Sequence, residues 1–113
     1  MKLERPVIEY EINYQPMENL EAFQNLTVRP VIKMLNSELR YYFNSYCKKF
    51  FKKGHFTRQE KVDTLFAKQE IKLKFIGLVL GHFKIEEIQY YVDNTKEIDK
   101  RISQIIKERL KSI

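Results

Sequence analysis

His82 is the side chain in this sequence with the widest choice of chemistry, and Glu86 follows it four positions later. If a helix began at His82, the two side chains would share a face and could bind a metal ion or act as an acid–base pair. A catalytic zinc site, however, usually has three protein ligands. We therefore expect His82 to cap a helix or to bond a backbone carbonyl, with no metal and no cofactor. A small metal or ligand site at His82 and Glu86 is the second alternative.

A second chemically suggestive stretch mixes cations with aromatic rings. Its cations are Lys48, Lys49, Lys52, Lys53, Arg58 and Lys61. Cations that contact phosphates, next to rings on which bases stack, are typical of nucleic-acid binding. On a helix, however, these cations are spread around the axis and do not form one face. We expect a solvated helix end, with nucleic-acid binding as the first alternative and docking of an acidic arm or partner as a further one.

Cys47 is the single cysteine, so the chain cannot form an internal disulfide. Lysines nearby would lower the pKa of its thiol, but no histidine lies at a fixed local spacing to activate it. We expect a buried spectator. The sequence has no glycine-rich phosphate loop, no paired-cysteine motif and no nucleophile elbow. Catalysis is therefore not expected.

The composition fits one domain built from long helices. Of the 113 residues 43% are hydrophobic, while only three are Gly and three are Pro, which suits helices with short connections. The longest apolar run, residues 75–81, is too short to span a bilayer, and no apolar run of signal-peptide length follows the charged start. Together with the single cysteine, these features predict a cytoplasmic protein that does not enter a membrane.

The net charge of +6 is unevenly distributed along the chain. Residues 1–25 carry two cations and five carboxylates, whereas residues 26–66 carry nine cations and three carboxylates. An acidic arm thus precedes a basic body. Such an arm can lie on the basic surface of its own subunit or of a neighbouring one, which leaves less positive field for an outside anion.

The arm has the pattern of a half-buried strand between Pro6 and Pro16. Apolar residues alternate with Glu9, Glu11 and Asn13, and a period of two is typical of strands. The apolar positions are Ile8, Tyr10, Ile12 and Tyr14. Because a lone strand cannot satisfy its own backbone, it pairs with the same segment of another subunit or lies extended over helices. We assign residues 1–16 to the arm and residues 17–113 to a single helical domain.

Helical spacing dominates that domain. We expect a short helix within residues 17–26, then an amphipathic helix of about 22 residues that starts near Pro30 and ends near Gly54. Residues 57–60 have the form of a capping box and start the next helical stretch. Its spacing continues to Gly81, as one helix or as two with a break between Ala67 and Glu70.

The last helix is predicted to run unbroken from Ile85 to the end of the chain, about 29 residues and 43 Å. Few domains of this size can cover an apolar stripe of that length, so part of it should meet another subunit. In addition, Gly77 and Gly81 leave a shallow groove that another helix could approach.

Two stretches give the chain a resemblance to known proteins. Arg29-Pro30-Val31-Ile32-Lys33 opens one helix, and Gly77-Leu78-Val79-Leu80-Gly81-His82-Phe83 closes another before an acidic final helix. From residue 28 onward the chain resembles a family of small all-helical bacterial proteins without an established function. Members sometimes carry a glyoxalase label. That activity is not carried over, because glyoxalase-type metal sites need several strands or a dense His and Asp cluster.

We therefore predict an all-α domain of three or four helices in an orthogonal or bundle-like arrangement, with an extended N-terminal arm. The predicted function is that of a non-catalytic, homo-oligomeric interaction or regulatory protein. Its partner is a further copy of itself, as a homodimer or a larger assembly. The predicted interface residues are Ile8, Tyr10, Ile12, Tyr14, Tyr42, Tyr46, Ile102, Ile106 and Leu110.

Overall fold

The computed structural model describes residues 18–112, and every regular element in this range is a helix. In chain order the elements are α1 (Leu20–Phe23), the π-helical turn η1 (Gln24–Val28), α2 (Arg29–Met34), α3 (Asn36–Phe50), α4 (Arg58–Phe66), α5 (Gln69–Leu80), α6 (Ile85–Asp93) and α7 (Thr95–Lys111). The predicted all-α, bundle-like fold is confirmed. The N-terminal arm lies outside the described residues, and so do its interface candidates Ile8, Tyr10, Ile12 and Tyr14.

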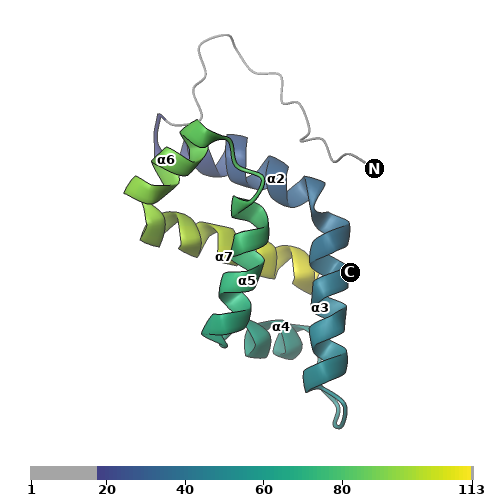
Figure 1. The fold of residues 1–113 in the computed structure, drawn as a ribbon. Coiled ribbons are helices and arrows are strands. Elements are labelled where there is room, and N and C mark those ends of the chain that lie inside the picture. Colours follow the sequence, from purple (N-terminus) through teal and green to yellow (C-terminus); the bar gives the residue numbers. More distant parts are fainter. Residues whose placement is uncertain (1–17, 113) are drawn as a thin grey trace.

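The first rod of the fold is continuous from α1 through η1 to α2 (Figure 1). Asn19 begins it, because its side-chain oxygen accepts a hydrogen bond from the Ala22 amide at 2.8 Å. Pro30 lies inside this rod, where its ring would clash with the carbonyl four residues earlier in a regular α-helix. The wider π turn lies just before it, with the Arg29 amide bonded to the Gln24 carbonyl five residues back. α2 begins at Arg29 with Pro30 in its first turn, as predicted, but it continues the preceding π turn directly and does not follow a loop.

A bend at Leu35 separates α2 from α3, so the predicted long helix consists of two segments. Leu35 has φ −90° and ψ 11°, away from helical values. Its amide still bonds to the Val31 carbonyl at 3.0 Å, and its carbonyl accepts from the Leu39 amide at 2.9 Å. α3 ends at Phe50, and Gly54 adopts φ +101° in the loop that follows. This left-handed conformation suits glycine.

The stretch from Thr57 to Gly81 forms two helices, which decides between the two alternatives. The capping box is confirmed: the Thr57 hydroxyl accepts from the Glu60 amide, and the Glu60 carboxylate accepts from the Thr57 amide, each at 3.1 Å. α4 ends before Ala67, and Lys68 is extended with ψ 110°. The break thus lies within the predicted interval.

The predicted 29-residue final helix is wrong, because Asn94 breaks it into α6 and α7. The Asn94 side chain donates to the Tyr90 carbonyl at 3.0 Å, and the Thr95 hydroxyl donates to the Tyr91 carbonyl at 3.0 Å. Asn and Thr side chains often compete with helical hydrogen bonds in this way. Across the break, the Tyr91 hydroxyl donates to Asp99 at 2.6 Å and links the two helices. These bends give the fold more segments than the three or four predicted.

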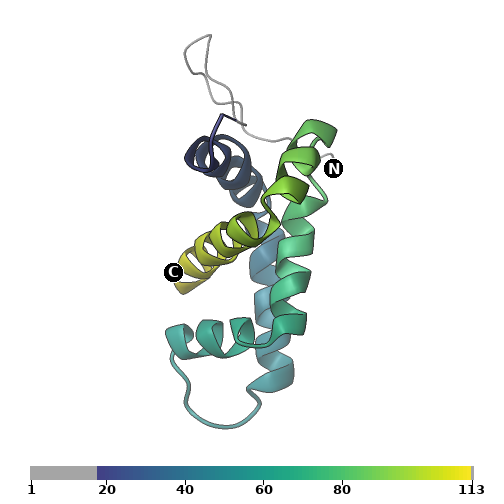
Figure 2. The same cartoon turned by 90° about the vertical axis from the view of Figure 1, so that its left-hand side faces the viewer.

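α7 is the central helix of the described chain. It contacts α2, α3, α4, α5, α6 and η1, and it crosses behind α5 between the α1–α2 rod and α4 (Figures 1 and 2). Four of its apolar residues are at most 1% exposed: Ile98, Ile102, Ile106 and Leu110. Burying such a side chain stabilises the fold by about 1.5–3 kcal/mol.

The burial of α7 corrects the predicted interface. Ile102, Ile106 and Leu110 were assigned to contacts with a second subunit, but all three are covered by helices of their own chain. The shortened α7 is only 17 residues long, and this length is within what the domain can cover. Of the interface candidates in the described residues, Tyr42 and Tyr46 remain accessible.

Candidate functional site

An open groove lies between α3 and α5, two helices that run in opposite directions on the same side of the molecule (Figures 1 and 2). It consists of two adjoining pockets of about 300 and 410 Å³ that share Tyr46 and Lys74. We call it the aromatic groove and define it by Tyr42, Tyr46 and Phe50 of α3 and by Ile71, Lys74, Phe75, Gly77 and Leu78 of α5.

The walls of the aromatic groove are held by ring contacts that reach into the core. The Tyr46 ring lies 6.0 Å from Phe75 and 6.3 Å from Phe50, measured between ring centroids. Phe75 in turn stacks on buried Phe66 at 5.0 Å. Such aromatic pairs add roughly 0.5–1.5 kcal/mol each beyond area burial. The rings are therefore positioned before any partner binds.

Gly77 keeps one part of the groove open. A Cβ atom added at Gly77 would meet no atom within 4 Å, so the space above it is unfilled. Across the groove, Tyr42 is 43% exposed. Glycine in a helix interior lowers stability by roughly 0.5–1 kcal/mol relative to alanine. No close contact within the fold requires a glycine at position 77.

Lysines surround the end of the aromatic groove that lies at the beginning of α5. The Lys49 and Lys68 ammonium groups lie 5.5 and 5.3 Å from the centre of the Phe50 ring, within range of a cation–π contact. Lys74 pairs with Glu70 at 3.9 Å, and both side chains are largely exposed. The rim therefore has more cations than carboxylates and favours an acidic partner.

The predicted nucleic-acid residues do not form one surface. Lys48, Lys49, Lys52 and Lys53 are exposed at the end of α3 and in the following loop, and Lys61 is half-buried in α4. Arg58 is used by the fold, since its guanidinium donates to the Leu110 carbonyl and lies 5.2 Å above the Phe43 ring. Only the four exposed lysines remain as a basic patch.

Two arginines cap the carboxyl end of α7, a role that the sequence analysis missed. Arg40 donates to the carbonyls of Arg109 and Ser112 at 3.1 and 3.2 Å, and Arg58 supplies the third bond, to Leu110. The last carbonyls of a helix lack intrahelical partners and attract cations. No local pattern could have revealed these bonds, because Arg40 and Arg109 are 69 positions apart.

The metal or ligand alternative at His82 receives no support from the geometry. α6 begins at Ile85, so His82 lies in the preceding turn and does not share a helical face with Glu86, and both residues are exposed. Within residues 18–112, no three His, Cys, Asp or Glu residues are placed to hold a metal ion together. The buried carboxylate is Glu87, which accepts from the Thr27 hydroxyl at 2.9 Å and from the Lys84 amide at 2.7 Å. It joins η1 to the start of α6.

Cys47 is partly buried and packs against the core. Burial raises the pKa of its thiol, and this effect exceeds the opposite effect of the positive charges of Lys61 and Arg58. Because the thiolate is the reactive form, these surroundings make the thiol less reactive at neutral pH, and the spectator role stays a prediction.

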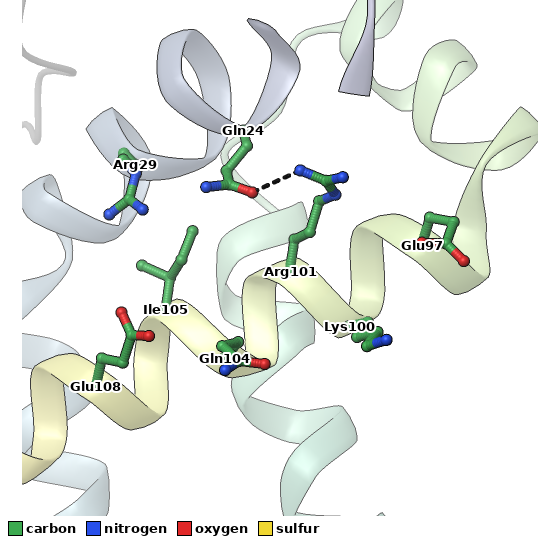
Figure 3. Close-up of a pocket in the computed structure, with 8 residues that line it drawn as sticks. All are labelled: Gln24, Arg29, Glu97, Lys100, Arg101, Gln104, Ile105 and Glu108. Atoms are coloured by element: carbon green, nitrogen blue, oxygen red, sulfur yellow. Dashed lines mark hydrogen bonds between the residues drawn. The ribbon is translucent and has the colours of Figure 1, made fainter. Parts of the chain in front are cut away.

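A polar cleft of about 240 Å³ lies between the first rod and α7 (Figure 3). Arg101 donates to the Gln24 side chain at 2.8 Å across it, and Ile105 forms part of its wall. Its charged lining residues are the cations Arg29, Lys100 and Arg101 and the carboxylates Glu97 and Glu108. Because charges of both signs face it, the cleft has no clear preference for an anion or a cation, and we interpret it as a seam between helices.

Comparisons with known proteins add no family to this description: no family model matches the chain, and no curated protein or solved structure is significantly similar to it. The resemblance to small all-helical bacterial proteins therefore stays a prediction. None of the helices within residues 18–112 has the length and apolar character needed to cross a membrane.

Proposed function

We propose that the protein is a non-catalytic interaction or regulatory protein that binds further copies of itself through the aromatic groove. The observation that supports this proposal is the accessible Tyr42 and Tyr46 side chains facing the unfilled space above Gly77. Tyrosines with an apolar body and a polar tip are enriched at protein interfaces and often dominate their binding energy.

The geometry of the groove supports a specific contact. The Tyr46 and Phe75 rings are already held by contacts to the core, so their burial by a partner loses less conformational entropy than the burial of mobile side chains would. The lysine rim makes binding more selective for an acidic surface and speeds up association. Its contribution to the affinity itself is smaller. An apolar floor with a charged rim is the usual composition of a protein interface.

The test is the mass of the intact protein by light scattering, over roughly a hundredfold range of concentration, since self-association follows mass action. We expect at least twice the monomer mass of 13.8 kDa at the upper end. Gly77→Gln, which puts a polar side chain into the groove, should shift the protein to monomer. A monomeric wild type at every concentration would refute the proposal.

Gly81→Gln is the matched control. It introduces the same side chain one turn later, at the end of α5, where an added Cβ makes ordinary contacts of 3.5 and 3.6 Å with two carbonyls. Gly81 does not line the groove. The control should therefore retain the wild-type mass, and loss of association in both variants would mean that the groove is not the joining surface.

A second candidate function is nucleic-acid binding by Lys48, Lys49, Lys52 and Lys53, which are all exposed. Phosphate contacts of this kind predict an affinity that falls steeply with salt concentration. Replacing Lys52 and Lys53 with Glu should abolish binding to single-stranded DNA, while the same change at exposed Lys84 and Lys96 should leave it unchanged. Absence of salt-sensitive binding in the wild type would exclude this function.

A further inference from the structure

We propose that residues 8–14 of a second copy bind in the aromatic groove as an extended segment. This inference rests on the proposed self-association and names the part of the partner that enters the groove. In a symmetric dimer, the segment of each copy would bind in the groove of the other copy. Both contacts then form within one closed dimer.

Charge complementarity is the first reason for this occupant. The segment carries Glu9 and Glu11 and no cation, whereas Lys49, Lys68 and Lys74 line the groove. Among the described residues that line the groove, the one carboxylate is Glu70, and it already pairs with Lys74. Opposite charges across the interface would therefore select this acidic segment over the basic remainder of the chain.

The side-chain pattern of the segment fits a groove with an apolar floor. Every second residue of an extended chain points to the same side, so that one side of the segment is apolar throughout. The four residues of that side are Ile8, Tyr10, Ile12 and Tyr14. Their burial against Tyr46, Phe75 and Leu78 would remove apolar surface of both copies from water. Glu9 and Glu11 then face away from the floor of the groove. There the long side chains of the rim lysines can reach their carboxylates.

The lengths also correspond. Six steps of about 3.3 Å give an extended segment of roughly 20 Å from Ile8 to Tyr14. The groove follows α5 from Lys68 to Leu78, and ten steps of about 1.5 Å give a helix length of roughly 15 Å, before side chains add to it. One segment of this size can therefore occupy both adjoining pockets.

The attachment of the segment constrains the same chain more than a second copy. The first rod packs against α6 and the turn before it, where the Phe23 ring lies 4.9 Å from Tyr90 and 5.6 Å from Phe83. Between Tyr14 and the first described residue, Glu18, the chain spans at most about 14 Å. The other end of the groove, in contrast, is lined by residues at the beginning of α5, and α5 begins next to α4 (Figure 1). The same chain could therefore fill the groove only with Tyr14 at the Leu78 end, whereas a segment from another copy can lie in either direction.

The experiment is trans-complementation between two full-length variants. Ile12→Glu places a charge on the apolar side of the segment and leaves the groove intact, while Gly77→Gln blocks the groove and leaves the segment intact. Each variant alone should dimerise at least about tenfold more weakly than wild type. Mixed together, they should form a heterodimer, detected by native mass spectrometry, because one intact groove meets one intact segment.

Asn13→Glu is the matched control, since it introduces the same residue on the opposite side of the segment and should retain wild-type dimerisation. If Ile12→Glu dimerises like wild type, or if the mixture yields no heterodimer, the inference is overturned while the proposed self-association stands. If the wild-type protein is monomeric, the proposed function fails as well. Circular dichroism of both variants at the wild-type level verifies that each is folded.

Discussion

The apolar stripe of α7 and the aromatic groove between α3 and α5 come from similar sequence patterns, but the stripe is buried and the groove is exposed. Both repeat apolar residues every three or four positions. The stripe of α7 is almost completely covered, with Ile102 and Ile106 0% exposed, whereas Tyr42 and Phe50 in the groove are each 43% exposed. Periodicity alone therefore does not distinguish a core helix from a docking surface.

The difference arises from the neighbours of each helix. α7 has helices on several sides, because the chain bends at Leu35, at Lys68 and at Asn94 and wraps around it. Between α3 and α5, in contrast, a Cβ atom added at Gly77 would meet no atom within 4 Å, so no described segment covers this position. A stripe becomes core when bends bring other segments over it, and it stays available for binding when none does.

The largest expected effect is the loss of a side chain from the α7 stripe. Ile106→Ala should lower the free energy of unfolding by about 2–5 kcal/mol, since it removes buried methyl groups and leaves a cavity. Leu73→Ala on α5, where the side chain is 48% exposed, should cost less than about 1 kcal/mol. Urea denaturation measures both, and equal losses would contradict the contrast between the two regions.

The next effect concerns the arginine cap of α7. Arg58→Ala removes the bond to the Leu110 carbonyl and the contact with Phe43, so it should cost about 1.5–3 kcal/mol. Lys52→Ala, an exposed cation in the neighbouring loop, should change stability by less than about 0.5 kcal/mol. If the two changes had the same effect in urea denaturation, Arg58 would be only a surface cation.

A smaller effect of opposite sign is expected in the groove. Gly77→Ala should raise the free energy of unfolding by about 0.5–1 kcal/mol, because alanine favours the helix and its Cβ meets no atom within 4 Å. At Gly54 the same change should destabilise, since φ is +101° and the added Cβ would lie 3.0 Å from the Phe56 ring. Thermal melts of both variants test this prediction, and a loss of stability at Gly77 would show that the groove is filled.

The smallest effect is the pH dependence of the link between α4 and α7. Lys111 at 2.8 Å, together with Lys107 at 3.4 Å, holds the pKa of Asp63 below its ordinary value of 3.8. The folded state thus binds the proton more weakly than the unfolded state, so this contribution is present above pH 3.8 and is lost as the pH falls through the lower folded value.

Asp63→Asn should therefore be slightly less stable than wild type near neutral pH, and the two midpoints of urea denaturation should converge in acid. The effect should also shrink in high salt, because exposed ion pairs are screened. A constant difference between the two proteins from neutral pH to strong acid would show that Asp63 acts through packing or helix propensity instead.

Local signals in the sequence predicted the helical class, the capping box at Thr57 and the break after Ala67. The bend at Asn94 was missed, because the hydrogen bond from its side chain to the Tyr90 carbonyl depends on how the chain turns there. The resulting error in helix length led to the wrong interface on α7. Distant contacts such as Arg40 with Arg109 were also missed, because hydrogen bonds between residues 69 positions apart leave no periodic trace.

The candidate site was predicted only in part, through Tyr42, Tyr46 and the groove at Gly77. The sequence placed these residues on predicted helices but could not show that α3 and α5 leave a space between them. The contribution of Phe75 and Phe66, which hold Tyr46 from behind, follows from packing between helices. Nor could composition reveal that Arg58 is used by the fold while its lysine neighbours stay exposed.

The position of α7 has a consequence for biosynthesis. During translation, earlier segments leave the ribosome first and generally fold before later ones. Here the helix that fills the middle of the fold follows all the others that surround it. Until the residues of α7 have emerged, the preceding helices lack the apolar side chains against which they pack. The nascent domain would therefore expose apolar surface until α7 is complete, and chaperones could protect it during this time.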